Sequence, residues 1–119
     1  MIASIKNSGS LAPTEFFKCL SDETRLAVLC LLHQQSPLCV CEIHWLLGLS
    51  QPKVSRHLSL LRQTKLVDTH KKSQWVYYSL GEAWESWMQE AFSALVAEIE
   101  LTTAKRLDDL VDMPNRPCV

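Results

Sequence analysis

The sequence contains no apolar run of about 18 residues, the length that a helix needs to cross a bilayer. Its N-terminal stretch, M-I-A-S-I-K-N-S-G-S, also lacks the apolar core of a secretory signal peptide. We therefore expect a cytoplasmic protein with no membrane association. In that compartment the five cysteines are expected to be thiols, ligands or sensors rather than a disulfide framework.

The motifs of common enzyme classes are also missing. The chain has no Gly-rich phosphate loop, no paired-carboxylate cleft and no C-x-x-C motif. A thiol-dependent reductase that uses Cys39 and Cys41 is therefore a weak alternative, and we do not expect an enzyme.

Positive charge is concentrated in one segment. The formal net charge is -1, yet residues 53–72 contain six Lys or Arg side chains against one acid. From residue 82 onward, eight acids outnumber three Lys or Arg side chains. The middle segment therefore carries a positive field, which a DNA-facing surface needs because phosphate contacts supply most of the non-specific affinity.

Length and composition predict one domain. A chain of 119 residues that is 47% hydrophobic can bury a compact core and still provide a subunit interface. We expect a flexible N-terminal arm at residues 1–12, a folded domain at 13–112 and a flexible tail at 113–119. Within the domain, a short helix is expected from Pro13, and a central core helix at about 23–35.

Residues 50–63, S-Q-P-K-V-S-R-H-L-S-L-L-R-Q, are predicted to form a short helix. Ser50 is a good N-cap, and Pro52 falls in the first turn, where its missing N–H is harmless. Apolar residues recur at i, i+4 and i+7 and form one buried stripe: Val54, Leu58 and Leu61. The rest of the surface is rich in Arg, Lys, Gln and Ser and has no acid. This composition suits a DNA major groove better than a solvated surface helix, which usually pairs its bases with acids.

The neighbouring segments predict a winged helix-turn-helix. A helix over 39–47, stopped by Gly48, leads directly into the basic helix. Downstream, Leu66–Val67 and Trp75–Tyr78 have the composition of strands and flank a polar tip at 71–74. A hairpin with a basic tip at this place is a wing that reaches phosphates or the minor groove, and it also closes the core.

The predicted DNA contacts lie on the basic helix and at the wing tip. They are Gln51, Lys53, Ser55, Arg56, His57, Ser59 and Arg62 on the helix, and Lys71, Lys72 and Gln74 on the wing. Bases or phosphates are the expected targets of Gln51, Lys53, Ser55 and Arg56. The DNA backbone is the expected target of His57, Ser59 and Arg62, and the alternative for His57 is a half-buried position. A helical protein-interaction module with a vestigial helix-turn-helix is the rival interpretation, and salt-dependent binding to a palindromic duplex separates the two.

One long helix is predicted from Glu82 to about Leu110. Its apolar stripe keeps an i, i+3/i+4 rhythm and includes two Trp, a Met and a Phe: Trp84, Trp87, Met88, Phe92, Leu95, Val96 and Ile99. This is more apolar surface than one small domain covers, which favours a homodimer interface. The alternative is packing within one chain, and we expect part of the stripe to serve that role.

These segments together resemble the arsenic-repressor (ArsR/SmtB) family of bacterial metal-sensing winged-helix repressors. The resemblance covers residues 16–96 through separated motifs: F-F-K-C-L-S-D-E-T-R-L (16–26), L-C-V-C-E (38–42), L-S-Q-P-K-V-S-R-H-L-S-L-L-R (49–62) and W-V-Y-Y-S-L (75–80). It implies a mainly helical winged helix-turn-helix that dimerises through its terminal helices. Such a protein binds a palindromic operator when ligand-free, without a cofactor, and leaves it when an inducer binds.

The most similar branch is the arsenical resistance operon repressors, which carry L-C-V-C at the start of the third helix. That branch has a third cysteine three residues after the second, where this chain has His44. Glycines expected before the first wing strand and at the wing tip are replaced by Lys65 and Ser73; a positive φ at Lys65 is expected to cost about 1 kcal/mol. The zinc-sensing members use His and acidic ligands on the last helix, and the predicted last helix contains no His.

Cys39 and Cys41 are the predicted inducer ligands. Thiolates are soft ligands that suit trivalent arsenic or antimony, and also Cd or Zn. On a regular helix, side chains two residues apart point about 200° away from each other. Binding through both sulfurs is therefore expected to distort the first turn of the 39–47 helix and to tilt the basic helix that follows. The alternative is a pair of small buried hydrophobes.

The third ligand is left open by the sequence. Cys41 and His44 share a helix face, and a His ligand favours Zn or Cd over arsenic. Arsenic can instead use two thiolates and a hydroxide, or recruit Cys118 from the tail. A thiol-redox or persulfide sensor that uses Cys39 and Cys41 is a further alternative. Cys19 and Cys30 are expected to be packing residues of core helices.

Overall fold

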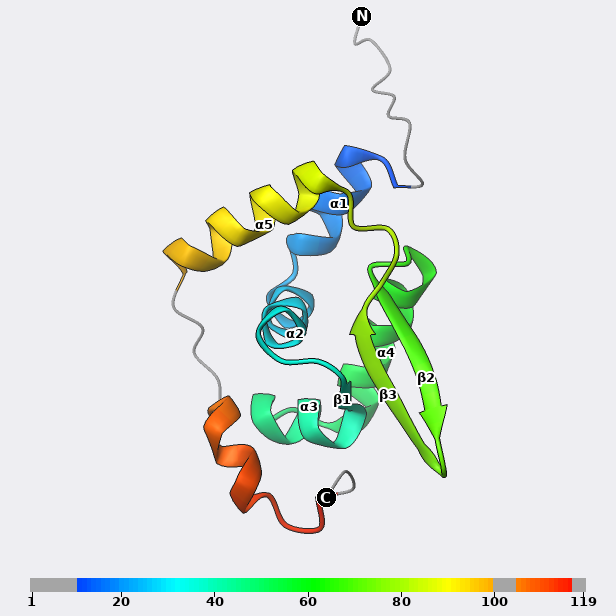
Figure 1. The fold of residues 1–119 in the computed structure, drawn as a ribbon, viewed down its shortest axis with the longest axis vertical. Coiled ribbons are helices and arrows are strands. Elements are labelled where there is room, and N and C mark those ends of the chain that lie inside the picture. Colours follow the sequence, from blue (N-terminus) through cyan, green and yellow to red (C-terminus); the bar gives the residue numbers. More distant parts are fainter. Residues whose placement is uncertain (1–10, 100–104, 117–119) are drawn as a thin grey trace, which may run out of the picture.

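The computed structural model describes residues 11–99 and 105–116. The described chain is mainly helical and carries a small antiparallel sheet (Figure 1). The elements in chain order are α1 Pro13–Leu20, α2 Glu23–Gln34, β1 Leu38–Cys39, α3 Val40–Leu47, α4 Gln51–Gln63, β2 Val67–Lys72, β3 Trp75–Leu80, α5 Ser86–Glu98 and the 3-10 helix η1 Leu107–Asp112. The predicted winged helix-turn-helix is confirmed.

Helix α2 is the centre of the core. Six consecutive residues, Ala27 to Leu32, are buried, so the helix is covered on nearly every side. In Figure 1, α5 lies above α2, α3 lies below it, and α4 lies on the side of the wing; both α3 and α4 contact α2. Each fully buried Leu or Val contributes about 1.5–3 kcal/mol of hydrophobic free energy. Helix α2 is therefore held firmly in the core, and α3 and α4 pack against it.

The helix-turn-helix boundaries follow from local capping. Gly48 ends α3 with φ 68°, and its N–H donates to the His44 carbonyl oxygen at 2.9 Å. Glycine adopts this left-handed conformation without the penalty of a Cβ. Ser50 then starts α4, because its Oγ accepts the Lys53 backbone N–H at 3.3 Å. The connection between α3 and α4 is therefore short and hydrogen-bonded.

The sheet has the strand order β1-β3-β2, and both pairings are antiparallel. Strands β2 and β3 form the wing, with Lys72 opposite Trp75 next to the turn. Lys65 and Ser73, the two positions where the resemblance expects glycine, have φ 64° and 60°. The backbone therefore keeps the left-handed conformation with side chains in place, as predicted for Lys65.

The prediction of one long helix from Glu82 to Leu110 is wrong. Residues before Ser86 form a loop that is anchored by the Trp84 indole N–H, which donates to the Leu66 carbonyl oxygen at 2.9 Å. At the other end, Ile99 is extended, with φ −102° and ψ 146°. Residues 100–104 lie outside the described part of the chain. The segment after them, including η1, packs against α3, where the carbonyl oxygen of Leu46 accepts the Lys105 N–H at 2.9 Å.

None of the helices in the described part of the chain is both long and apolar enough to span a bilayer.

Candidate DNA-binding surface and inducer site

Helix α4 separates an apolar face from a polar, acid-free face. Val54, Leu58 and Leu61 are fully buried, as predicted. Five of the predicted DNA contacts are exposed on the other side: Gln51, Lys53, Arg56, Ser59 and Arg62. Ser55 is half-buried. The buried stripe fixes the rotation of the helix, so its hydrogen-bonding side chains point to solvent together.

His57 contacts the N-terminal end of α2. Its Nδ1 lies 3.7 Å from Asp22 Oδ2 and 3.4 Å from Arg25 Nη1, and its side chain is 19% exposed. Arg25 Nε also donates to the Cys19 carbonyl oxygen at 3.0 Å. This polar cluster ties α4 to α2, and it supports the half-buried alternative for His57 rather than a place on the exposed face.

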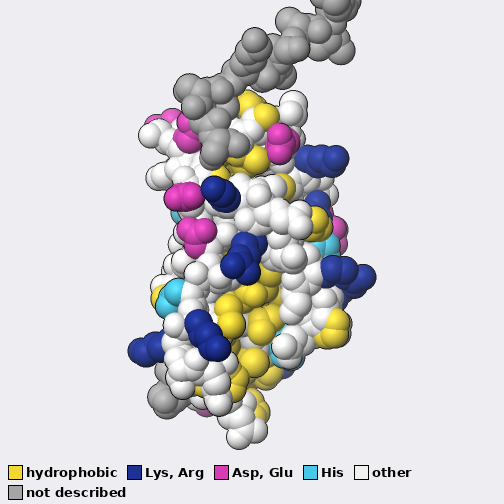
Figure 2. Space-filling model, turned by 90° about the vertical axis from the view of Figure 1, so that its right-hand side faces the viewer, with side chains coloured by type: hydrophobic (Ala, Val, Ile, Leu, Met, Phe, Trp, Pro, Cys, Tyr) yellow, Lys and Arg dark blue, Asp and Glu magenta, His cyan; other side chains and the backbone are white. Residues whose placement is uncertain are grey.

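The wing tip presents only exposed polar side chains. Lys71, Lys72 and Gln74 are all exposed, whereas Tyr77 on β3 is 7% exposed and stacks on His70 with ring centroids 5.6 Å apart. Figure 2 shows Lys and Arg side chains spread from the upper to the lower part of the face that carries the wing and α4, while most of the acids on this face lie in its upper half. This face can therefore attract a polyanion through both elements.

Cys39 lies at the junction of the wing sheet and α3. It belongs to β1, where it pairs with Tyr77 of β3, and it is also the N-cap of α3 with an extended backbone (φ −87°, ψ 163°). The helix thus begins at Val40 and not at Cys39, because pairing with β3 holds Cys39 extended. A displacement of Cys39 would act on α3 and on the wing at the same time.

The Cys39 side chain is only 1% exposed. Burial raises the pKa of its thiol to about 12, and the nearby Glu42 carboxylate adds to the increase. The thiol is therefore protonated and covered in this conformation, and an ion can reach it only after local rearrangement. Cys41 is half-buried in the first turn of α3. The two predicted inducer ligands are neighbours with different accessibility.

The described residues do not assemble a three-ligand metal site. His44 Nδ1 lies 3.2 Å from the Leu49 carbonyl oxygen, in the connection to α4. Within residues 11–99 and 105–116, no three His, Cys, Asp or Glu side chains lie close enough together to hold a metal ion. Cys118 lies outside this part of the chain. The sulfurs of Cys39 and Cys41 suit a thiophilic ion. The conformation in this structure must change before both sulfurs can bind the same ion.

Residues 22–69 match the family described as bacterial regulatory protein, arsR family. Over 110 residues the chain is 38% identical to an arsenic resistance transcriptional regulator of Pseudomonas putida, covering 90% of this chain and 86% of that protein. The chain belongs to the ArsR family. It is also 46% identical over 77 residues to the arsenical resistance operon repressor of Escherichia coli, covering 65% of this chain and 66% of that protein.

Solved structures of transcriptional regulators agree with the fold. The transcriptional regulator HlyU of Vibrio vulnificus superposes with a TM-score of 0.60 at 38% identity, covering 68% of this chain and 80% of that one. The transcriptional repressor BigR of Xylella fastidiosa gives 0.62 at 28% identity, with 73% and 85% covered. Family and fold together make this ArsR-family protein a DNA-binding transcriptional repressor and not an enzyme.

Glu42 and Arg116 are site residues of this ArsR-family chain that the sequence interpretation missed. Glu42 Oε1 accepts the Cys39 backbone N–H at 2.9 Å, and its Oε2 accepts from Arg116 Nε at 2.7 Å. Glu42 follows Cys39 by three residues, which is the spacing of a capping box and was a usable signal. Arg116 is 74 residues away in sequence, and no local pattern pointed to it.

Proposed function

We propose that this protein is a repressor that binds a palindromic operator when inducer-free and releases it when trivalent arsenic or antimony binds Cys39 and Cys41. The position of Cys39 carries the proposal. This residue pairs with the wing through Tyr77 and caps α3, the helix joined to α4 by a short connection. A soft ion that draws both sulfurs together would change the start of α3, and with it the relative placement of α4 and the wing.

The proposed DNA contacts are the half-buried Ser55 and the exposed polar residues of α4 and of the wing tip. Base reading is assigned to Arg56 with Gln51, Lys53 and Ser55, because this face carries bidentate donors without competing acids. Ser59, Arg62, Lys71, Lys72 and Gln74 are assigned to the sugar-phosphate backbone, which fixes the position of the protein on DNA.

A homodimer would place two such surfaces on the two halves of a palindrome. Helices α1 and α5 offer the surface for it. Phe17 is 53% exposed, and its ring lies 6.2 Å from that of Trp87. Further along α5, Leu95 and Val96 are half-buried. Met88 and Phe92, in contrast, are buried in the core, so the predicted stripe is divided between the core and the proposed interface.

A cadmium- or zinc-responsive repressor is the second candidate. A cadmium resistance transcriptional regulatory protein of Listeria innocua is 43% identical over 63 residues, which is 53% of each chain. His44 stands three residues after Cys41 and would supply the nitrogen ligand that Zn or Cd accepts. Cys118 is the alternative third ligand, and thiol oxidation or persulfide formation at Cys39 and Cys41 is an alternative signal.

The decisive experiment is a DNA-release titration with arsenite, antimonite, Cd, Zn and an oxidant. Wild type is expected to release operator DNA with arsenite or antimonite, and the Cys39→Ser and Cys41→Ser variants are expected to stay bound. Cys19→Ser is the matched control, because it removes a half-buried thiol away from α3. If the Cys39→Ser and Cys41→Ser variants release DNA at the wild-type arsenite concentration, the proposal is contradicted. A His44→Ala variant that loses only the Cd response would favour the second candidate.

A further inference from the structure

The Glu42 carboxylate joins the start of α3 to the C-terminal segment. Among the residues that the structure describes, Glu42 is the only charged side chain that is fully buried. One of its oxygens accepts the Cys39 N–H at 2.9 Å, and the other accepts from Arg116 Nε at 2.7 Å. In the other half of the capping box, the Glu42 backbone N–H faces the Cys39 sulfur. A buried carboxylate needs such partners to offset its lost hydration.

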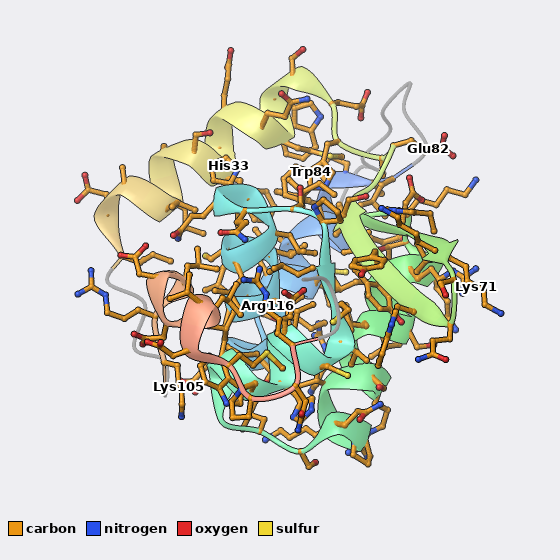
Figure 3. All side chains as sticks on the ribbon, turned by 60° about the horizontal axis from the view of Figure 1, so that its bottom comes forward. His33, Lys71, Glu82, Trp84, Lys105 and Arg116 are labelled. Atoms are coloured by element: carbon orange, nitrogen blue, oxygen red, sulfur yellow. The ribbon has the colours of Figure 1, made fainter. Side chains whose placement is uncertain are left out.

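Arg116 belongs to a segment, residues 105–116, that runs along the whole of α3; we call it the strap. At the C-terminal end of α3, the Lys105 N–H donates to the Leu46 carbonyl oxygen at 2.9 Å, and its ammonium lies 4.9 Å from the centre of the Trp45 ring. Between these ends, Leu110 is buried in the core. Figure 1 shows the strap passing beside α3, and Figure 3 labels Lys105 and Arg116 at two separate places along the strap.

We propose that the strap holds the first turn of α3 in its inducer-free form and thereby sets the inducer concentration at which DNA is released. This inference rests on the proposed function, in which Cys39 and Cys41 bind the inducer. Drawing the Cys39 sulfur toward Cys41 takes it out of the capping box. The Cys39 N–H then leaves Glu42, and the arrangement that positions Glu42 for Arg116 is lost. Strap docking and inducer binding therefore oppose each other.

The direction of the effect follows from linkage. A contact present only in the inducer-free form weakens inducer binding, so its removal should tighten binding. Arg116→Ala removes one charge-assisted hydrogen bond and is expected to lower the arsenite midpoint for DNA release by about tenfold. Arg116 is thus a positioning residue that acts through Glu42. Arg116→Lys keeps the charge and should restore part of the wild-type midpoint.

The test is the arsenite release titration on full-length protein, with operator affinity also measured without arsenite. Arg106→Ala is the matched control, since it removes an exposed cation from the same strap. Glu42→Gln completes a double-mutant cycle, because Gln still accepts the Cys39 N–H but has no charge for Arg116 to pair with. We expect Arg116→Ala to shift the midpoint in the wild-type background, and to shift it little further in the Glu42→Gln background.

The strap proposal is wrong if Arg116→Ala leaves the arsenite midpoint unchanged, or if it shifts the midpoint equally in the wild-type and Glu42→Gln backgrounds. Either result would leave the proposed function intact. If wild type does not release DNA with arsenite, the proposed function fails and the strap inference fails with it. Hydrogen exchange of wild type provides a readout that needs no variant to fold. Amides of residues 105–116 are expected to exchange faster when arsenite is added. If arsenite changes amide exchange in the first turn of α3 but not in residues 105–116, the strap proposal is also wrong.

Discussion

Two exposed cations on the proposed DNA-binding surface are placed for different tasks. Arg56 lies on the acid-free face of α4, while Lys72 lies beside the turn of the wing. A guanidinium on a helix in the major groove can bind a base edge bidentately, whereas an ammonium at the tip of a hairpin acts as a point charge toward phosphate. Loss of Arg56 should therefore change sequence preference, and loss of Lys72 should change affinity for every duplex.

Arg56→Ala is expected to weaken operator binding by about 1–3 kcal/mol and to affect a random duplex less. Lys72→Ala is expected to weaken both duplexes alike and to reduce the slope of log K against log salt by about 1. Fluorescence anisotropy at several salt concentrations measures both effects. Equal losses on specific and random DNA with Arg56→Ala would contradict its base-reading role.

At the scale of elements, the contact between α2 and α4 is a polar cluster built on a helix N-cap. Asp22 Oδ2 accepts the Arg25 backbone N–H at 3.0 Å and lies 3.7 Å from His57 Nδ1. The Arg25 backbone hydrogen bond holds the pKa of the Asp22 carboxyl below its ordinary value of 3.8, with the charges of His57 and Arg25 adding to the effect. Because the folded state favours the ionised carboxylate, this cap stabilises above pH 3.8, and its contribution is lost as pH falls through the lowered pKa.

Asp22→Ala is expected to lower the free energy of unfolding by about 1 kcal/mol at pH 7, as for other lost N-caps. The difference from wild type should shrink as the pH falls below 3.8, because the wild-type carboxyl then becomes protonated too. Urea unfolding at pH 7 and at acidic pH measures it. Glu90→Ala is the control, since it removes an exposed carboxylate within α5; a pH-independent Asp22→Ala deficit would argue against the ionised cap.

Local sequence patterns predicted the helices whose capping residues and apolar stripes lie within or next to the helix itself. The helix-turn-helix was predictable from Gly48, Ser50 and the apolar stripe of α4, because capping and burial there involve residues that are close in sequence. The end of α5 could not be predicted from periodicity, because Lys105 and η1 pack on α3, which lies far away in sequence. The same reason applies to the candidate site. Cys39 and Cys41 are predicted as ligands from their soft thiolates and from the L-C-V-C motif of the resembled family, but Arg116 reaches Glu42 only through the tertiary fold.

At the scale of the whole molecule, the proposed binding to a palindromic operator depends on how two copies would be joined. One copy presents only one α4 and one wing, and a palindrome offers two half-sites. Phe17 packs edge-on to Phe16 with centroids 5.3 Å apart, yet it leaves 53% of its surface exposed. Phe16 is completely buried and also contacts Trp87, so the aromatic cluster extends from the core of one copy to its surface. An exposed aromatic continuous with the core is typical of an interface anchor.

Phe17→Glu is expected to raise the dimer dissociation constant at least about tenfold, because it places a charge in the proposed interface. Sedimentation velocity over a range of concentrations measures this constant. Affinity for the full palindrome should fall with it, while binding to a half-site duplex stays the same, since α4 and the wing are untouched. Val111→Glu places the same charge on another surface residue, 80% exposed on η1, and should leave dimerisation unchanged. If the two variants sediment alike, the interface lies elsewhere than on α1 and α5.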